Sequence, residues 1–178
     1  CRLATRVQRW AVNNDKMLHR LICYLESSRD YRLRGYANDD PKDLELRLFV
    51  DADFAGDVQD AKSTSGGYLA LWGPHTFFPV MWLSKRQTST SRSTTEAEIV
   101  SLAAALSSEA LPAMQLWDML LGRSVTLRIM EDNEATIKVA RKGYSAKLRH
   151  VLRTHKVNIS SIKEVLDEDN VLIEHVKT

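Results

Sequence analysis

The sequence has 178 residues and a formal net charge of +2 at pH 7, with 44% hydrophobic and 27% charged residues. This length suits one globular domain with a short appendage, and the composition excludes a disordered chain. Apolar runs are short and interrupted, so we expect no membrane-spanning segment. Two cysteines make no disulfide framework or zinc cluster, which favours a reducing compartment. The first residue is Cys1 rather than Met, so we interpret the sequence as a piece of a longer chain.

Charge is distributed unevenly along the chain. Residues 1–36 contain eight Lys or Arg against three Asp or Glu, whereas residues 37–60 contain eight acidic residues against two basic ones. Between Glu134 and Glu164 the chain has eight basic residues and no acidic one. An acidic segment between two basic ones suits a site that binds cations and contacts a polyanion. Solvated surface patches are the alternative explanation.

The N-terminal part differs in pattern from the rest. Residues 3–26 carry apolar side chains at helical spacing, which predicts an amphipathic helix with a break at Asn13–Asp15. Residues 27–43 form a polar segment that ends in a turn signal. We therefore expect a helical tail or tether over residues 1–43 and one main domain over residues 44–178.

From residue 44 the apolar residues alternate with polar ones, which predicts a strand with one apolar face over 44–51. The remaining patterns predict, in chain order, strands 68–72 and 77–84, helices 95–106 and 112–121, strand 125–130, helices 134–141 and 148–166, and strand 171–176. Three strands followed by helices and two further strands predict an α/β domain that begins with antiparallel strands.

Carboxylates lie at strand ends and at a helix start, where a compact domain brings distant residues together. Asp51 ends the first predicted strand and Asp132 follows the fourth. Glu96 and Glu98 begin the helix predicted over 95–106. Buried like charges are unfavourable unless a cation neutralises them, so such a cluster predicts hard ions such as Mg²⁺. Taken singly, each acid also has a structural explanation as a turn residue, a helix-start charge or a cap.

Several sequence blocks occur together in one order: Asp51–Asp57, Lys62–Gly66, Trp82–Gln87, Ser93–Glu98 and Glu131–Asn133. In these blocks the chain resembles the ribonuclease H domain of copia-type LTR retrotransposon polyproteins, over about residues 44–177. Residues 1–43 resemble the C-terminal tail of the reverse transcriptase region that precedes this domain.

The resemblance implies a ribonuclease H-like fold, a five-stranded mixed sheet flanked by helices. It implies metal-dependent hydrolysis of the RNA strand of RNA/DNA hybrids, with two Mg²⁺ ions or Mn²⁺ as a substitute. Asp51 corresponds to the carboxylate of the first strand and Asp132 to that of the fourth. The Ala-Glu-hydrophobic pattern selects Glu98 as the helix carboxylate. Helical phase leaves Glu96 as the alternative, because the two glutamates lie about 200° apart and both flank the apolar stripe.

The sequence departs from the family at a fourth acid. Where many relatives carry Asp, this chain has Leu152, and no acid occurs nearby to replace it. His155 lies on the same predicted helical face as Leu152, so we expect either a ligand or proton carrier at the carboxylates, or a core histidine. Asn158 is a weaker candidate. His150 points to another face of that helix and is expected to contact nucleic acid or solvent.

The resemblance also implies partners: an RNA/DNA hybrid and the upstream reverse transcriptase domain of the same polyprotein, in a cytoplasmic virus-like particle, with no membrane. Basic residues are expected to contact the phosphates of the hybrid; the candidates are Lys85, Arg86, Lys142, Lys147, Arg149 and Arg153. The loss of the fourth acid leaves one alternative function, a hybrid-binding module with weak or lost catalysis. An integrase-like enzyme is disfavoured, because that family reads Asp, Asp, Glu along the chain and this sequence reads Asp, Glu, Asp.

Overall fold

The computed structural model describes residues 3–56 and 60–177. Asp57, part of the acidic block in the sequence, lies outside these residues. The chain forms two compact units, Cys1–Arg34 and Gly35–Thr178. This division places residues 35–43 with the larger unit, although the sequence pattern suggested a boundary after residue 43.

The first unit is helical. A short 3-10 helix, Ala4–Arg9, precedes α1, Val12–Ser28. The expected break at Asn13–Asp15 is wrong, because the interruption falls at Trp10 and Ala11 and α1 continues through those polar residues. The indole Nε1 of Trp10 donates to Oδ1 of Asp15 at 2.7 Å, so Asp15 fastens the start of the helix rather than ending it.

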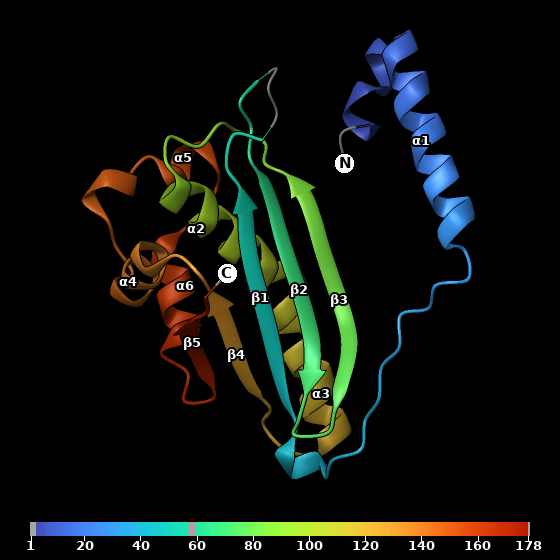
Figure 1. The fold of residues 1–178 in the computed structure, drawn as a ribbon. Helices are drawn as coiled ribbons and strands as arrows, with labels where there is room; N and C mark the ends of the chain where they lie inside the picture. Colours follow the sequence, from blue (N-terminus) through green and yellow to red (C-terminus); the bar gives the residue numbers. More distant parts are fainter. Residues whose placement is uncertain (1–2, 57–59, 178) are drawn as a thin grey trace. The chain divides into compact units, whose positions relative to one another are not determined.

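The second unit is built on a five-stranded sheet with the strand order β3-β2-β1-β4-β5 (Figure 1). Three strands form an antiparallel meander: β1, Glu45–Asp53; β2, Thr64–Trp72; and β3, Phe77–Arg86. Two more run parallel to β1 on its other side: β4, Thr126–Glu131, and β5, Val171–His175. This confirms the predicted five-stranded mixed sheet of a ribonuclease H-like fold, although β1 and β2 are each longer than expected.

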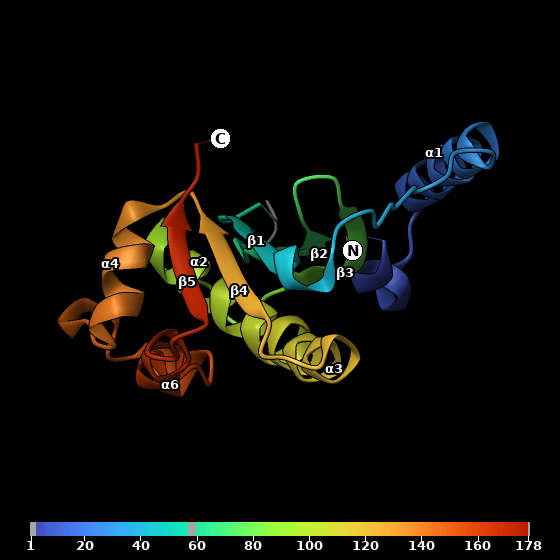
Figure 2. The same ribbon diagram turned by 90° about the horizontal axis from the view of Figure 1, so that it is seen from below.

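Helices cover one face of this sheet, and Figure 2 shows α2 and α3 on that side. A continuous helix is made of α2, Thr94–Ala105, a π-helical turn, Leu106–Ala110, and α3, Leu111–Leu121. Separate helices were expected here. The joined helix is long and apolar enough to cross a membrane by length and composition, but half of its apolar window is buried. Its inner face packs on the strands as a core helix does. The largest fully buried apolar residues of the two layers are Leu46, Leu48, Leu69, Leu71, Ile99, Leu102, Leu127 and Ile129.

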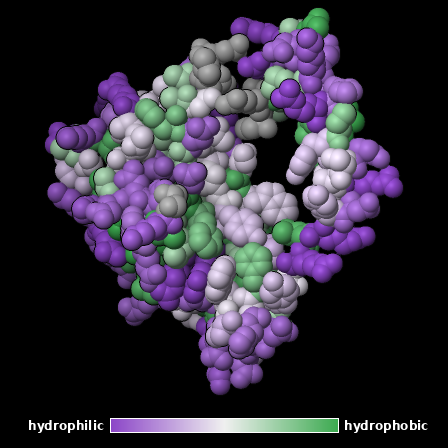
Figure 3. Space-filling model, in the orientation of Figure 1, coloured by the Kyte–Doolittle hydropathy of each residue, from purple (hydrophilic) through white to green (hydrophobic). Residues whose placement is uncertain are grey.

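The opposite face of the sheet, which is turned to the viewer in Figure 1, carries aromatic side chains. Phe49 and Trp72 have ring centroids 6.3 Å apart, and Tyr68 and Phe77 extend this row across β2 and β3. Arg47 stacks on Trp72 at 4.5 Å. Figure 3 shows pale and green residues in this region, surrounded by hydrophilic ones. The alternation along β1 therefore separates a fully buried aliphatic face from a half-buried aromatic face.

Three α-helices lie between β4 and β5 in the chain: α4, Glu134–Lys142; α5, Val151–Thr154; and α6, Ile159–Leu166. The single helix predicted over 148–166 is wrong. Lys156 has a φ of 61°, a left-handed conformation that ends the first piece, and Asn158 caps α6 by accepting from the backbone N–H of Ser160. The apolar residues before and after this break happen to fit the spacing of one helix. Leu152, one of those apolar residues, is exposed.

Candidate metal centre

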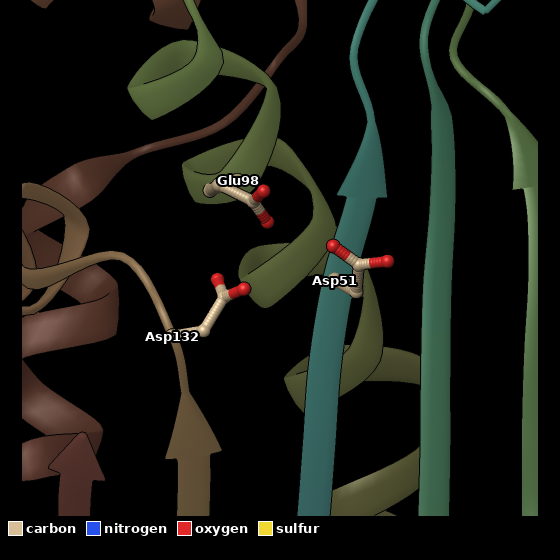
Figure 4. Close-up of side chains that lie close together, drawn as sticks. All are labelled: Asp51, Glu98 and Asp132. Carbon is tan, nitrogen blue, oxygen red and sulfur yellow. The ribbon is translucent and has the colours of Figure 1, made fainter. Parts of the chain in front are cut away.

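Three carboxylates meet at one end of the sheet. Asp51, Glu98 and Asp132 each offer one oxygen, and these oxygens all lie within 4.8 Å of one another (Figure 4). Asp51 lies in β1 and Asp132 directly follows β4. Because these strands are parallel neighbours, with Phe49 paired to Met130, residues just beyond that pair reach the same edge. The structure thus joins the three acids that the sequence selected.

The third acid comes from the first turns of α2. Ser93 caps this helix, with its side chain accepting from the backbone N–H of Glu96 at 3.2 Å. One helical turn beyond Glu98, the hydroxyl of Ser101 donates to the carbonyl of Asp51 at 2.7 Å and lies 3.1 Å from that of Gly66. This polar contact fixes the height of α2 on β1 and β2, and so places the Glu98 side chain opposite Asp51.

Glu98 is buried, and burial raises its pKa to about 8. The negative charges of Glu131, Asp51 and Asp132 contribute to this rise of the pKa, after burial, the largest cause. Oε2 of Glu98 is buried and makes no hydrogen bond within the described chain. The Glu98 carboxylate accepts a hydrogen bond from the backbone of Ala52, but its Oε2 has no such partner among the described residues and faces the other acids. This donor set is one that a hard divalent cation neutralises, so these residues fit an ion such as Mg²⁺.

Glu131 is a fourth acid that the sequence left without a role. It is fully buried at the end of β4, and burial raises its pKa to about 7. The backbone N–H of Asn133 donates to its Oε1 at 3.1 Å, which opposes that rise, while Asp132 and Asp51 add to it. Its place in an alternating strand is the only signal in the sequence, because position 131 falls on the apolar face of β4.

Glu96, the alternative to Glu98, belongs to a different group of side chains. Its Oε1 lies 3.2 Å from Nε2 of His155, and its Oε2 lies 3.1 Å from Nε2 of His150. The backbone N–H of Arg92 also donates to Oε2 at 3.0 Å. The structure therefore brings Glu98, and not Glu96, to Asp51 and Asp132.

The proposed replacements for the fourth acid lie elsewhere. The side chain of His155 is 1% exposed and faces Glu96 rather than the carboxylate group, and His150 does the same instead of facing solvent or nucleic acid. Asn158 is occupied as the cap of α6. Helical phase failed for these residues because they lie outside helix interiors: His150 and His155 flank the four-residue α5, and Asn158 precedes α6.

The predicted phosphate contacts are spread over two segments. On β3, Lys85 is exposed, and Arg86 pairs with Asp60. After α4, Nε of Arg149 donates a hydrogen bond to the hydroxyl oxygen of Tyr144 at 2.8 Å. The remaining candidates are exposed: Lys142, Lys147 and Arg153. Lys85 and Arg86 also line a cavity of about 340 Å³ together with residues of the 155–161 segment.

Comparison with known proteins gives relatives of one kind. No family model matches the sequence. Two Arabidopsis thaliana proteins, the retrovirus-related Pol polyproteins from transposons RE2 and RE1, are 40% identical over 86 residues and 47% identical over 60 residues. The chain is related to retrotransposon Pol polyproteins. These matches cover 48% and 34% of the chain, and the chain spans only 5% and 4% of the two polyproteins.

The chain is also similar to two other proteins. The secreted RxLR effector protein 161 of Plasmopara viticola is 38% identical over 88 residues, which are 49% of the chain and 57% of the effector. A solved ribonuclease H1, LC11-RNase H1 isolated from compost, aligns with 74% of the chain and 84% of its own, at 15% identity and a TM-score of 0.48. The predicted resemblance to a retrotransposon polyprotein is confirmed by the two Pol polyproteins.

Proposed function

We propose that this chain is a metal-dependent ribonuclease H that hydrolyses the RNA strand of RNA/DNA hybrids during reverse transcription. The observation that carries the proposal is the convergence of Asp51, Glu98 and Asp132, with oxygens within 4.8 Å, at the parallel strand ends of this fold. As part of the same proposal, the chain works with the reverse transcriptase domain of its polyprotein, in a cytoplasmic virus-like particle.

The three carboxylates would hold two Mg²⁺ ions, with Mn²⁺ as a substitute. Bound divalent ions supply activation of a water molecule and neutralisation of charge on the leaving oxygen. The chain itself contributes the arrangement of its acids. Glu98 is buried and prefers its proton until a cation binds, whereas Asp51 is exposed and keeps the group open to a phosphodiester from outside.

Basic side chains near this end of the fold would hold the nucleic acid backbone. Lys147 and Arg153 are exposed on the segment that passes the start of α2. Lys85 is exposed at the end of β3. Such contacts add affinity and orientation but carry no sequence information, which suits an enzyme that cuts hybrids of any sequence.

The alternative function is a hybrid-binding module with weak or lost catalysis. The observation that favours it is the composition of the segment between Glu134 and Glu164, which contains no acidic residue. A nuclease of this kind that lacks one of its carboxylates would bind its second ion more weakly.

Cleavage of a hybrid with a labelled RNA strand, in Mg²⁺ and in Mn²⁺, tests the proposal. We expect metal-dependent cleavage by the wild-type chain and none by Asp132→Asn. Asp169→Asn, an exposed acid in a turn, is the matched control and should cleave normally. Undiminished cleavage by Asp132→Asn would refute the site. Binding of hybrid without cleavage in either metal would select the binding module.

A further inference from the structure

The carboxylate of Glu96 is buried between two histidines that come from a distant part of the sequence. The side chains of Glu96 and His155 are each 1% exposed, and that of His150 is 26% exposed. Each histidine Nε2 faces a different oxygen of the carboxylate, at 3.1 Å and 3.2 Å. We call these three residues the Glu96 cluster. The carboxylate ligands of the metal centre do not include any of them.

The Glu96 cluster attaches α5 to the first turn of α2. His150 immediately precedes α5 and His155 immediately follows it, so both ends of this short helix reach one carboxylate. The hydroxyl of Ser89 also donates to the carbonyl of Thr154 at 2.8 Å. In Figure 1, α5 lies beside the N-terminal end of α2, the end that carries Glu98. A helix of four residues is unstable by itself, so these contacts determine where it lies.

Apolar side chains already anchor the segment around α5 to the core. Leu148 is 6% exposed and Val151 is fully buried in the core cluster. Replacing a buried polar group of this kind by apolar side chains is often neutral or stabilising, so net stability does not by itself explain the Glu96 cluster. His155 is hydrogen-bonded to Glu96 at one end of α5, and at the other end His150 Nε2 lies 3.1 Å from the same carboxylate without a hydrogen bond within the described residues. What these contacts add is a fixed orientation of the helix about its buried side chains.

Orientation matters because α5 and its flanks carry exposed cations beside the start of α2. Lys147 and Arg153 are exposed, and neither forms an ion pair with a residue among 3–56 and 60–177. Arg149, between them, is held on Tyr144 by two hydrogen bonds and a ring contact at 5.7 Å. Two cations that form no ion pair with the described residues therefore project from a segment that contacts Glu96.

We propose that Glu96, His150 and His155 are positioning residues, which orient Lys147 and Arg153 to contact the phosphates of a nucleic acid bound at the carboxylate end of the sheet. The inference deepens the proposed function and rests on it for the identity of the nucleic acid. The cluster acts through the two cations and does not touch the reacting atoms.

Hybrid affinity measured against salt concentration tests this role in the full chain. A cation placed on a phosphate adds about one released counterion to the salt dependence. We expect Glu96→Ala to weaken binding about fivefold and to lower the salt slope by about one. In cleavage assays its effect should fall on KM more than on kcat. Glu96→Gln keeps an oxygen acceptor and should recover most of the affinity.

A second background makes the test specific. In a chain carrying Lys147→Ala and Arg153→Ala, removal of Glu96 should weaken binding no further, because the cations through which it acts are gone. An equal loss in both backgrounds, or a Glu96→Ala chain with unchanged affinity and slope, overturns the proposal. His150→Ala, at the partly exposed end of the cluster, supplies the same comparison if Glu96→Ala does not fold. Glu164→Ala, an exposed acid on α6, is the control.

The outcome also separates this inference from the proposed function. If the wild-type chain binds hybrid without cutting it and the variants behave as expected, the nuclease proposal fails and the positioning role stands. If the wild-type chain cuts hybrid and Glu96→Ala binds and cuts like the wild type, the positioning role fails alone.

Discussion

The buried carboxylate of Glu98 makes stability depend on pH in a direction opposite to most acids. Its pKa in the folded chain is about 8, against an ordinary value of 4.5. Between these values the folded chain holds a proton that the unfolded chain has lost, so folding stability falls as pH rises. In the absence of divalent ions, Glu98→Gln removes an acid that resists ionisation, and it should stabilise the protein at alkaline pH.

The magnitude follows from the same difference. From 4.5 to about 8 the upper limit is about 5 kcal/mol, at about 1.4 kcal/mol per pH unit. The group opens to solvent at the exposed Asp51, and screening there reduces the effect, so we expect about 2 kcal/mol. The Glu98→Gln variant should still lose some stability as pH rises, because Glu131 remains and its pKa is also raised, to about 7.

Urea unfolding with a chelator present, at about pH 5 and about pH 8.5, measures this difference. The wild-type chain should lose stability over that interval, and Glu98→Gln should lose about half as much or less. Adding Mg²⁺ at the higher pH should stabilise the wild-type chain and not the variant, because a cation bound only by the folded state adds to its stability. Glu164→Gln serves as the matched control, since Glu164 is exposed. A wild-type stability that stays level or rises between the two pH values would refute the reasoning.

Three further substitutions test how the elements around the site are held, each read by urea unfolding. Ser101→Ala removes the contact between α2 and β1 and should cost about 1–2 kcal/mol; an unchanged midpoint would show that packing alone positions α2. Asn133→Ala removes the side chain that accepts from two N–H groups of α4 and should cost about 1 kcal/mol, with no loss expected only if water replaces it. Gly143→Ala forces a side chain at a φ of 69° and toward Lys163, and should destabilise by about 1 kcal/mol or more; a neutral result would contradict the left-handed end of α4.

Much of the candidate site was accessible to sequence reasoning. Alternating residues located β1, and the carboxylates at strand ends together with the resemblance to ribonuclease H domains singled out Asp51 and Asp132. The parallel pairing of β1 with β4 came from the structure. The motif carried by the resemblance selected Glu98, but helical phase left Glu96 as an alternative, because both flank the apolar stripe of α2 and each is buried in the structure. The choice depends on what lies opposite each side chain, namely the strand ends for one and two histidines for the other.

The region after α4 shows where pattern fails. Apolar residues at helical spacing over 148–166 predicted one helix, and a helix would have carried His155 on the face of Leu152. The left-handed Lys156 has no sequence signature of the kind that Gly or Asn gives, so the break was invisible. With the break, His155 turns into the interior and Leu152 remains exposed.

The sequence by itself determined the class of fold, the strands that carry two of the acids and the kinship to retrotransposon polyproteins, because periodicity and local motifs are encoded by neighbours in the chain. The tertiary structure removed Glu96 as the alternative to Glu98, and it alone showed that Glu131 is buried behind the acids and that Glu96 lies between two histidines. These features arise between residues far apart in sequence, where packing against a partner, rather than local preference, sets the direction of each side chain.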